Sequence, residues 1–122
     1  MTQPLEHLSF DRPDEVRGGD RWRLELLNLA GGAQVGRLTI QPGWKWSVDV
    51  KPVAGTDLCL APHQQDQLSG RMHVIMQDGT ELDTAAGEVT TLPPGHDAWV
   101  VGDEPVVAVD WQGASIWGLP QQ

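Results

Sequence analysis

Apolar and polar residues alternate along most of the chain in short runs, and turn residues separate these runs. Alternation with a period of two is typical of a strand that buries one face. In residues 44–50, for example, Trp44 and Trp46 fall on one face and Lys45 on the other. No stretch keeps a helical period for more than two turns. The pattern predicts strands over 22–29, 34–41, 44–50, 56–63, 71–77, 80–84, 88–92, 98–101 and 106–111, with a further edge strand over 115–119.

The turn residues favour an all-β fold. The chain contains 14 Gly and 9 Pro, which interrupt it about every ten residues, as in a sandwich or barrel. Nine or so short strands must hide their edges, and a double-sheet jelly roll does this in a single domain. We therefore predict a single-domain jelly-roll barrel over residues 21–119. Residues 1–20 are polar and are expected to form a loosely packed N-terminal arm.

Charge and cysteine content restrict the partners and the compartment. The 122 residues carry a formal net charge of −9, so nucleic acid and anionic membrane surfaces would repel the chain. The single cysteine permits no internal disulfide, which fits a reducing cytoplasm. The first ten residues lack the basic and apolar segments of a signal peptide, and no apolar run is long enough to cross a bilayer. We expect a cytoplasmic protein that binds a small molecule.

One segment resembles a known family. The stretch GEVTTLPPGHDAW (87–99) is similar to the second motif of the cupin superfamily, with Gly87, Pro93 and Gly95 in the expected places. The slot for the family's metal-binding histidine falls on Ala98, and His96 lies two residues before it. The resemblance covers about residues 35–112 and implies a cupin-like double-stranded β-helix, the jelly-roll barrel expected above.

The first cupin motif is present in spacing but not in residue type. Six residues before Gly70, the family's glutamate slot holds His63, and the two histidine slots hold Cys59 and Asp57. If the family's frame holds, these three side chains face the barrel interior. The resemblance then implies a metal site built from a different set of donors.

The donors suit a divalent transition metal. His96 lies on the same side of its strand as Ala98 and can reach the same cavity. The side chains of His63, His96, Cys59 and Asp57 form a mixed set of donors acceptable to Zn²⁺, Fe²⁺ or Ni²⁺. Structural roles remain open for each residue: a buried small side chain for Cys59, a backbone hydrogen bond for His63, an exposed turn for His96, and a turn cap for Asp57.

Four further residues are candidates for substrate binding. Gln65 and Gln67 fall on the same face as His63, where an uncharged amide needs a partner. Three interpretations of the two glutamines are open: they bind a ligand, they orient His63, or they lie on an irregular, solvated edge of a sheet. Trp44 and Trp46 offer a flat apolar wall, which suits a ligand, core packing or a dimer face equally.

The sequence argues against a role for the Cys59 thiol as a nucleophile activated by His63. Four residues along an extended strand separate Cys59 from His63 by roughly 13 Å. The same distance argues against a shared metal unless the chain turns at Pro62, as the cupin frame implies.

Two function hypotheses follow. The first is a small-molecule enzyme of the metal-dependent cupin type, with oxygenase, isomerase and lyase chemistry all open. The second is a metal-free cupin module that binds or senses a small polar ligand. Small cupins commonly pair through edge strands, so we also expect a homodimer. Neither His63 nor His96 is expected to be a main packing residue, and both are expected to approach one cavity from two strands.

Overall fold

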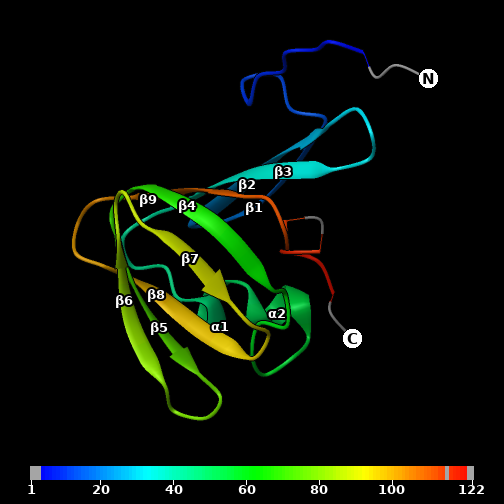
Figure 1. The fold of residues 1–122 in the computed structure, drawn as a ribbon. Helices are drawn as coiled ribbons and strands as arrows, with labels where there is room; N and C mark the ends of the chain where they lie inside the picture. Colours follow the sequence, from blue (N-terminus) through cyan, green and yellow to red (C-terminus); the bar gives the residue numbers. More distant parts are fainter. Residues whose placement is uncertain (1–3, 115, 121–122) are drawn as a thin grey trace.

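The chain folds into two antiparallel β-sheets that enclose one apolar core (Figure 1). The computed structural model describes residues 4–114 and 116–120. The first sheet has the strand order β1-β2-β3-β9-β4-β7 and the second has the order β6-β5-β8. The strands are β1 (Glu15–Gly19), β2 (Trp22–Asn28), β3 (Gln34–Ile40), β4 (His63–Ser69), β5 (Arg71–Met76), β6 (Glu81–Ala85), β7 (Val89–Leu92), β8 (His96–Val101) and β9 (Val106–Asp110).

This architecture confirms the all-β jelly roll, arranged as two separate sheets. Most strands lie within two residues of their predicted positions, and the sharp turn at Asp78-Gly79 joins β5 to β6 with Gly79 at a φ of 90°. The alternation also places side chains as expected, because Val106, Ala108 and Asp110 of β9 are all buried. Within the described part of the chain, no helix is long and apolar enough to cross a membrane.

The predicted strand over 44–50 is wrong. This segment forms the one-turn helix α1 (Trp46–Asp49), followed by a second one, α2 (Lys51–Ala54). The Asp49 carboxylate accepts a hydrogen bond from the Lys45 amide at 2.9 Å and closes the turn. Val48, which the alternation placed beside the tryptophans, is 60% exposed. The tryptophans are buried because a tight turn, rather than a pleated strand, brings both toward the core.

The predicted strand over 56–63 is also wrong. Thr56–Pro62 is a connecting segment whose strand-like pairing is the isolated bridge between Cys59 and His96. The regular strand begins at His63, directly after Pro62, and β4 lies between β7 and β9. The stretch from Gln64 to Ser69 is therefore an interior strand of the larger sheet and not an irregular, solvated edge.

The two ends of the chain also differ from the expectation. Within the segment assigned to the N-terminal arm, β1 pairs along its whole length with β2 and forms one edge of the larger sheet. Before β1, residues 4–14 lie beside the end of β2, where Asp14 accepts a hydrogen bond from the Asn28 amide at 2.8 Å and Glu6 accepts one from the Ala30 amide at 2.7 Å. Of the expected edge strand over 115–119, Ser115 lies outside the described residues, and residues 116–118 form a turn.

The bridge at Cys59 links the two sheets. The Cys59 amide donates to the carbonyl of His96 at 2.8 Å, and the Gly95 amide donates to the carbonyl of Cys59 at 2.7 Å. His96 begins β8 in the smaller sheet, whereas Cys59 precedes β4 in the larger sheet. The bridge thus brings the start of β4 and the start of β8 together at one end of the core.

Candidate functional site

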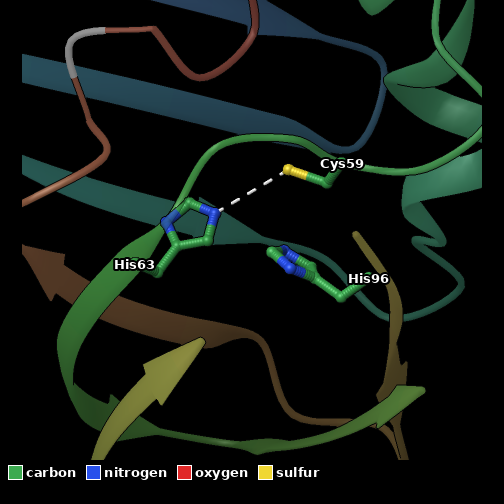
Figure 2. A group of neighbouring side chains, drawn as sticks. All are labelled: Cys59, His63 and His96. Atoms are coloured by element: carbon green, nitrogen blue, oxygen red, sulfur yellow. Dashed lines mark hydrogen bonds between the residues drawn. The ribbon is translucent and has the colours of Figure 1, made fainter. Parts of the chain in front are cut away.

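Three side chains converge beside this bridge (Figure 2). The potential ligand atoms of Cys59, His63 and His96 all lie within 4.8 Å of one another, and all three residues are buried. Cys59 Sγ is 3.9 Å from His63 Nε2, and the two imidazole ring centres are 5.3 Å apart. We call these three residues the Cys-His-His cluster. They come from the connecting segment, from the start of β4 and from the start of β8.

The chain curves between Cys59 and His63 (Figure 2), which explains why the two side chains meet. The sequence-based distance of roughly 13 Å assumed an extended strand, and the observed contact shows that assumption to be wrong. The backbone after β9 packs directly on this segment at Gly113. A Cβ atom built on Gly113 would lie 1.7 Å from the Pro62 carbonyl oxygen, so only glycine fits at this position.

A rigid corner places His96. Gly95 has a φ of 95°, in the left-handed region that favours glycine, and follows two prolines. Its amide is bonded to Cys59, so the corner is tied to the segment that carries the thiol. Pro93-Pro94-Gly95 thus fixes His96 against Cys59 before any ligand is involved.

Each histidine uses its Nδ1 atom outside the cluster. His96 Nδ1 lies 2.8 Å from the Pro93 carbonyl oxygen, which can only accept, so Nδ1 carries the proton. His63 Nδ1 is hydrogen bonded to the Asp110 carboxylate. Both Nε2 atoms are therefore left for the cluster. Histidines that bind metals in proteins are oriented in this way, with the second nitrogen donating to a carboxylate or a backbone carbonyl.

Asp110 is fixed by further hydrogen bonds. Its Oδ1 atom accepts from the amides of Gln112 at 2.9 Å and Gly113 at 3.2 Å, while Oδ2 faces His63. Asp110 was not among the predicted site residues. The signal was available, because Asp110 continues the inward face of β9 after Val106 and Ala108, where a carboxylate is unusual without a partner.

The cluster has a distinct charge distribution. Burial raises the pKa of the Cys59 thiol, but hydrogen bonds and charges from His63 and His96 outweigh it and lower the pKa to about 6. Burial lowers the pKa of His63, but Asp110 and then Cys59 outweigh it and raise the pKa to about 9. Both pKa shifts favour a thiolate beside an imidazolium in the metal-free pair, with the imidazolium held by a buried carboxylate.

The two histidines also line a small cavity between the sheets. Its volume is about 20 Å³, which exceeds the roughly 10–15 Å³ that one water molecule needs. This confirms that His63 and His96 approach one cavity from two strands. The lining residues are Leu38, Trp44, Trp46, His63, Gln65, Met72, Leu92, His96, Ala98, Val106, Ala108 and Trp117.

The other predicted site residues divide into two groups. Trp44, Trp46 and Gln65 line the cavity. Gln67 is fully buried elsewhere, where its amide bonds the Gly70 carbonyl at 2.8 Å and the Thr84 hydroxyl at 2.7 Å.

Asp57 does not join the cluster. Its side chain is 98% exposed and lies 3.3 Å from the Lys51 ammonium group. The expectation that Asp57 and Cys59 share one inward face required a strand over 56–63, and that strand does not form.

The donor set and its surroundings fit a metal ion. Zinc bonds of about 2.3 Å to sulfur and about 2.0–2.1 Å to nitrogen place tetrahedral ligand atoms roughly 3.3–3.6 Å apart. The cluster's ligand atoms, within 4.8 Å of one another, need to contract by about 1 Å to reach that spacing. Three protein ligands leave a coordination position free, as in catalytic zinc sites.

Comparison with protein-family models and with curated protein sequences yields no match. The fold does match solved structures. A protein of unknown function from Rhizobium leguminosarum bv. viciae 3841 aligns with 89% of this chain and 98% of its own, at 15% identity and a TM-score of 0.62. An oxalate decarboxylase variant from Bacillus subtilis aligns with 82% of this chain but 28% of its own, at 22% identity and a TM-score of 0.59.

A further match names the fold. A cupin-like protein from Thermotoga maritima aligns with 76% of this chain and 68% of its own, at 15% identity and a TM-score of 0.50. At these identities the similarity concerns the fold, which is a cupin-like jelly roll.

Proposed function

We propose, from this cupin-like fold, that the chain binds a divalent transition metal at the Cys-His-His cluster and is a metal-dependent small-molecule enzyme. The observation that carries the proposal is the orientation of the two histidines. His63 and His96 each use Nδ1 for a fixed acceptor, which leaves both Nε2 atoms beside the Cys59 sulfur. An enzyme among the fold's relatives, an oxalate decarboxylase, supports catalysis as the use of such a site.

The residues have separable roles in this proposal. Cys59, His63 and His96 hold the ion, and a thiolate with two imidazoles suits Zn²⁺, Fe²⁺ and Ni²⁺. Asp110 orients His63 and balances its charge. A metal in this position supplies a Lewis acid at the end of the cavity. Gln65, Trp44 and Trp46 form the walls that a substrate meets.

Elemental analysis of the purified chain, before and after incubation with each of the three metals, tests the proposal. We expect a stoichiometric metal in the unaltered chain, and its loss in Cys59→Ala, His63→Ala and His96→Ala. His73→Ala is the matched control, because His73 lies outside the cluster on β5 and is expected to leave metal content unchanged. A chain that takes up none of the three metals contradicts the proposal.

The second candidate is a metal-free binding or sensing module. It is favoured by the Cys59–His63–Asp110 contacts, which give both His63 nitrogens a partner without any metal. In that case the three variants alter ligand binding while the chain contains no metal. The same elemental analysis therefore separates the two candidates.

A further inference from the structure

A groove lies at one end of the larger sheet, apart from the Cys-His-His cluster and its cavity. Its volume is about 450 Å³, and it is lined by Asn28, Gly32, Ala33, Gln34, Trp111 and Gln112. These residues come from the hairpin that joins β2 to β3 and from the segment directly after β9. We call it the hairpin groove. Its volume is within the roughly 300–1,000 Å³ that is typical of small-molecule sites.

Trp111 supplies the aromatic surface of the hairpin groove. Its side chain is 46% exposed, whereas four of the other five tryptophans in the chain are buried. The indole Nε1 atom donates to the side-chain oxygen of Gln64 at 3.1 Å, and the Trp111 backbone amide donates to the Gln64 carbonyl, also at 3.1 Å. The ring is therefore held in one orientation before any ligand binds, which lowers the entropy that binding costs.

The polar groups of the hairpin groove are side-chain amides that are only partly paired. Gln34 Nε2 donates to Asn28 Oδ1, which leaves the Asn28 NH₂ group and the Gln34 side-chain oxygen without a partner among the described residues. The Gln112 side chain makes no hydrogen bond within the same part of the chain, although its backbone amide donates to Asp110. An amide donates through nitrogen and accepts through oxygen, so the groove offers both functions to a ligand.

The absence of charge on the wall selects the class of ligand. No Asp, Glu, Lys, Arg or His is among the described residues that line the hairpin groove. A hydroxyl group both donates and accepts, so it matches amides better than a carboxylate, which only accepts, or an ammonium group, which only donates. The C–H face of a sugar ring can pack on an indole, which offers a large apolar surface. An anionic sugar would also be repelled by the net charge of −9.

We propose that the hairpin groove binds a neutral mono- or disaccharide. One sugar ring packs on Trp111, and the hydroxyl groups bond to the side-chain amides of Asn28, Gln34 and Gln112. The inference goes beyond the proposed function, because no residue of the Cys-His-His cluster lines this groove and no metal takes part in the contacts.

Isothermal titration of the full chain with glucose, galactose, maltose and cellobiose tests the class of ligand. Glucuronate and glucosamine are the anionic and cationic probes. Each titration is made on chelator-treated and on zinc-loaded protein. We expect saturable binding of at least one neutral sugar, equal in the two preparations, and weaker binding of both charged probes. No saturable binding of any neutral sugar, or tighter binding of glucuronate, overturns the inference without the use of any variant.

Variants then locate the saccharide. Trp111→Ala removes the ring and is expected to weaken binding about tenfold or more, whereas Trp111→Phe keeps an aromatic ring and is expected to weaken it less. Gln112→Ala removes an amide and is expected to weaken binding roughly two- to tenfold. Trp99→Ala is the matched control, because Trp99 lies outside the groove, beside Lys45 and His73, and is expected to leave binding unchanged. Circular dichroism identifies any variant that has not folded.

The outcomes separate this inference from the proposed function. Sugar binding that Trp111→Ala weakens, in a chain that takes up no metal, supports the saccharide site and contradicts the metal proposal. Sugar binding that requires zinc and is unchanged in folded Trp111→Ala overturns the inference and leaves the metal site intact. A chain that binds no sugar, and whose dimer dissociates in Trp111→Ala on analytical ultracentrifugation, assigns the groove to a second copy and also overturns the inference.

Discussion

His63 and His73 each place a ring nitrogen against an aspartate, yet only one belongs to the candidate site. His73 Nδ1 lies 2.7 Å from Asp83, and its Nε2 lies 2.7 Å from Glu81, so carboxylates occupy both nitrogens. Its ring also lies 4.8 Å from that of Trp99. His63 has one carboxylate, Asp110, and turns its other nitrogen toward a thiol and a cavity. An imidazole can bind a metal ion or ligand when only one of its two nitrogens is held by a carboxylate.

Burial is the second difference between the two histidines. The His63 and Asp110 side chains are each 5% exposed, whereas those of His73 and Asp83 are 21% and 78% exposed. Asp83 and then Glu81 raise the pKa of His73 by hydrogen bonds made in contact with solvent. Water and salt weaken such surface pairs, but they reach the buried pair poorly. The same residue types are therefore expected to respond differently to mutation, pH and salt.

The largest expected effect is that of removing the buried aspartate, Asp110. Asp110→Ala leaves a buried imidazole and the amides of Gln112 and Gly113 without their acceptor, and is expected to lower the free energy of unfolding by about 3–5 kcal/mol. Asp83→Ala is the matched control, and we expect little change because its partner is solvated. Urea denaturation of the metal-free chain measures both. Equal losses in the two variants would show that burial does not distinguish the pairs.

The pH dependence of stability gives a smaller effect. The pKa of His63 rises from 6.5 to about 9 on folding, so its contribution is present below pH 6.5 and is lost as pH rises through about 9. The pKa of Cys59 falls from 9.0 to about 6, so its contribution is present above pH 9 and is lost as pH falls through about 6. With rising pH, His63 lowers the free energy of unfolding and Cys59 raises it. The two effects nearly cancel, so we expect these two groups to leave the free energy of unfolding of the metal-free chain nearly constant between about pH 6.5 and 9.

Cys59→Ala breaks this balance. The variant keeps the Asp110–His63 pair, so the free energy of unfolding is expected to fall with rising pH above 6.5, by at most about 1.4 kcal/mol per pH unit. Urea denaturation across this range measures the slope, with the unaltered chain as control. A variant whose stability is as constant as that of the unaltered chain contradicts the thiolate–imidazolium pair.

The smallest expected effect is that of salt on the two imidazoles. The Debye length falls to about 3 Å in 1 M salt, so the raised pKa of His73 is expected to move back toward its ordinary value. The pKa of His63 is expected to change much less, because its partners are buried. Proton NMR titration of the histidine ring resonances at low and high salt measures both. Equal movement of the two pKa values would mean that solvent reaches the cluster.

The sequence predicts the strands well where alternation and turn residues agree. The strand predicted over 34–41 is observed as Gln34–Ile40, and the strand predicted over 71–77 is observed as Arg71–Met76. The segment after Gly43 shows the limit of this signal. Its apolar residues alternate as in a strand, but the hydrogen bond from the Lys45 amide to Asp49 folds it into a helical turn. A local side-chain contact of this kind leaves no mark on the period of the pattern.

The candidate site could be predicted in part for a similar reason. Spacing in the cupin-like motifs identifies Cys59 and His63, and His96 was added because it lies on the same face of its strand as the motif's histidine slot. The structure brings these three residues together. The same spacing wrongly added Asp57 to the predicted ligands, because the prediction relied on a strand over 56–63. The structure has a connecting segment there. Alternation places Asp110 on the inward face of its strand, but does not show that its partner is His63, which lies 47 residues earlier in the chain and is connected to it by no motif. Contacts between strands that are distant in sequence require the fold.

The bridge between Cys59 and His96 also bears on how the chain opens. The backbone hydrogen bonds between Cys59 and His96 connect the larger sheet to the smaller one. The sheets therefore cannot separate without pulling the Cys59 thiol and the His63 imidazole away from the His96 imidazole. The Cys59 amide is therefore expected to exchange its hydrogen with solvent only when the whole domain opens. A metal ion or ligand bound at the Cys-His-His cluster would slow this exchange. The exchange rate of the Cys59 amide therefore reports whether the two sheets are held together.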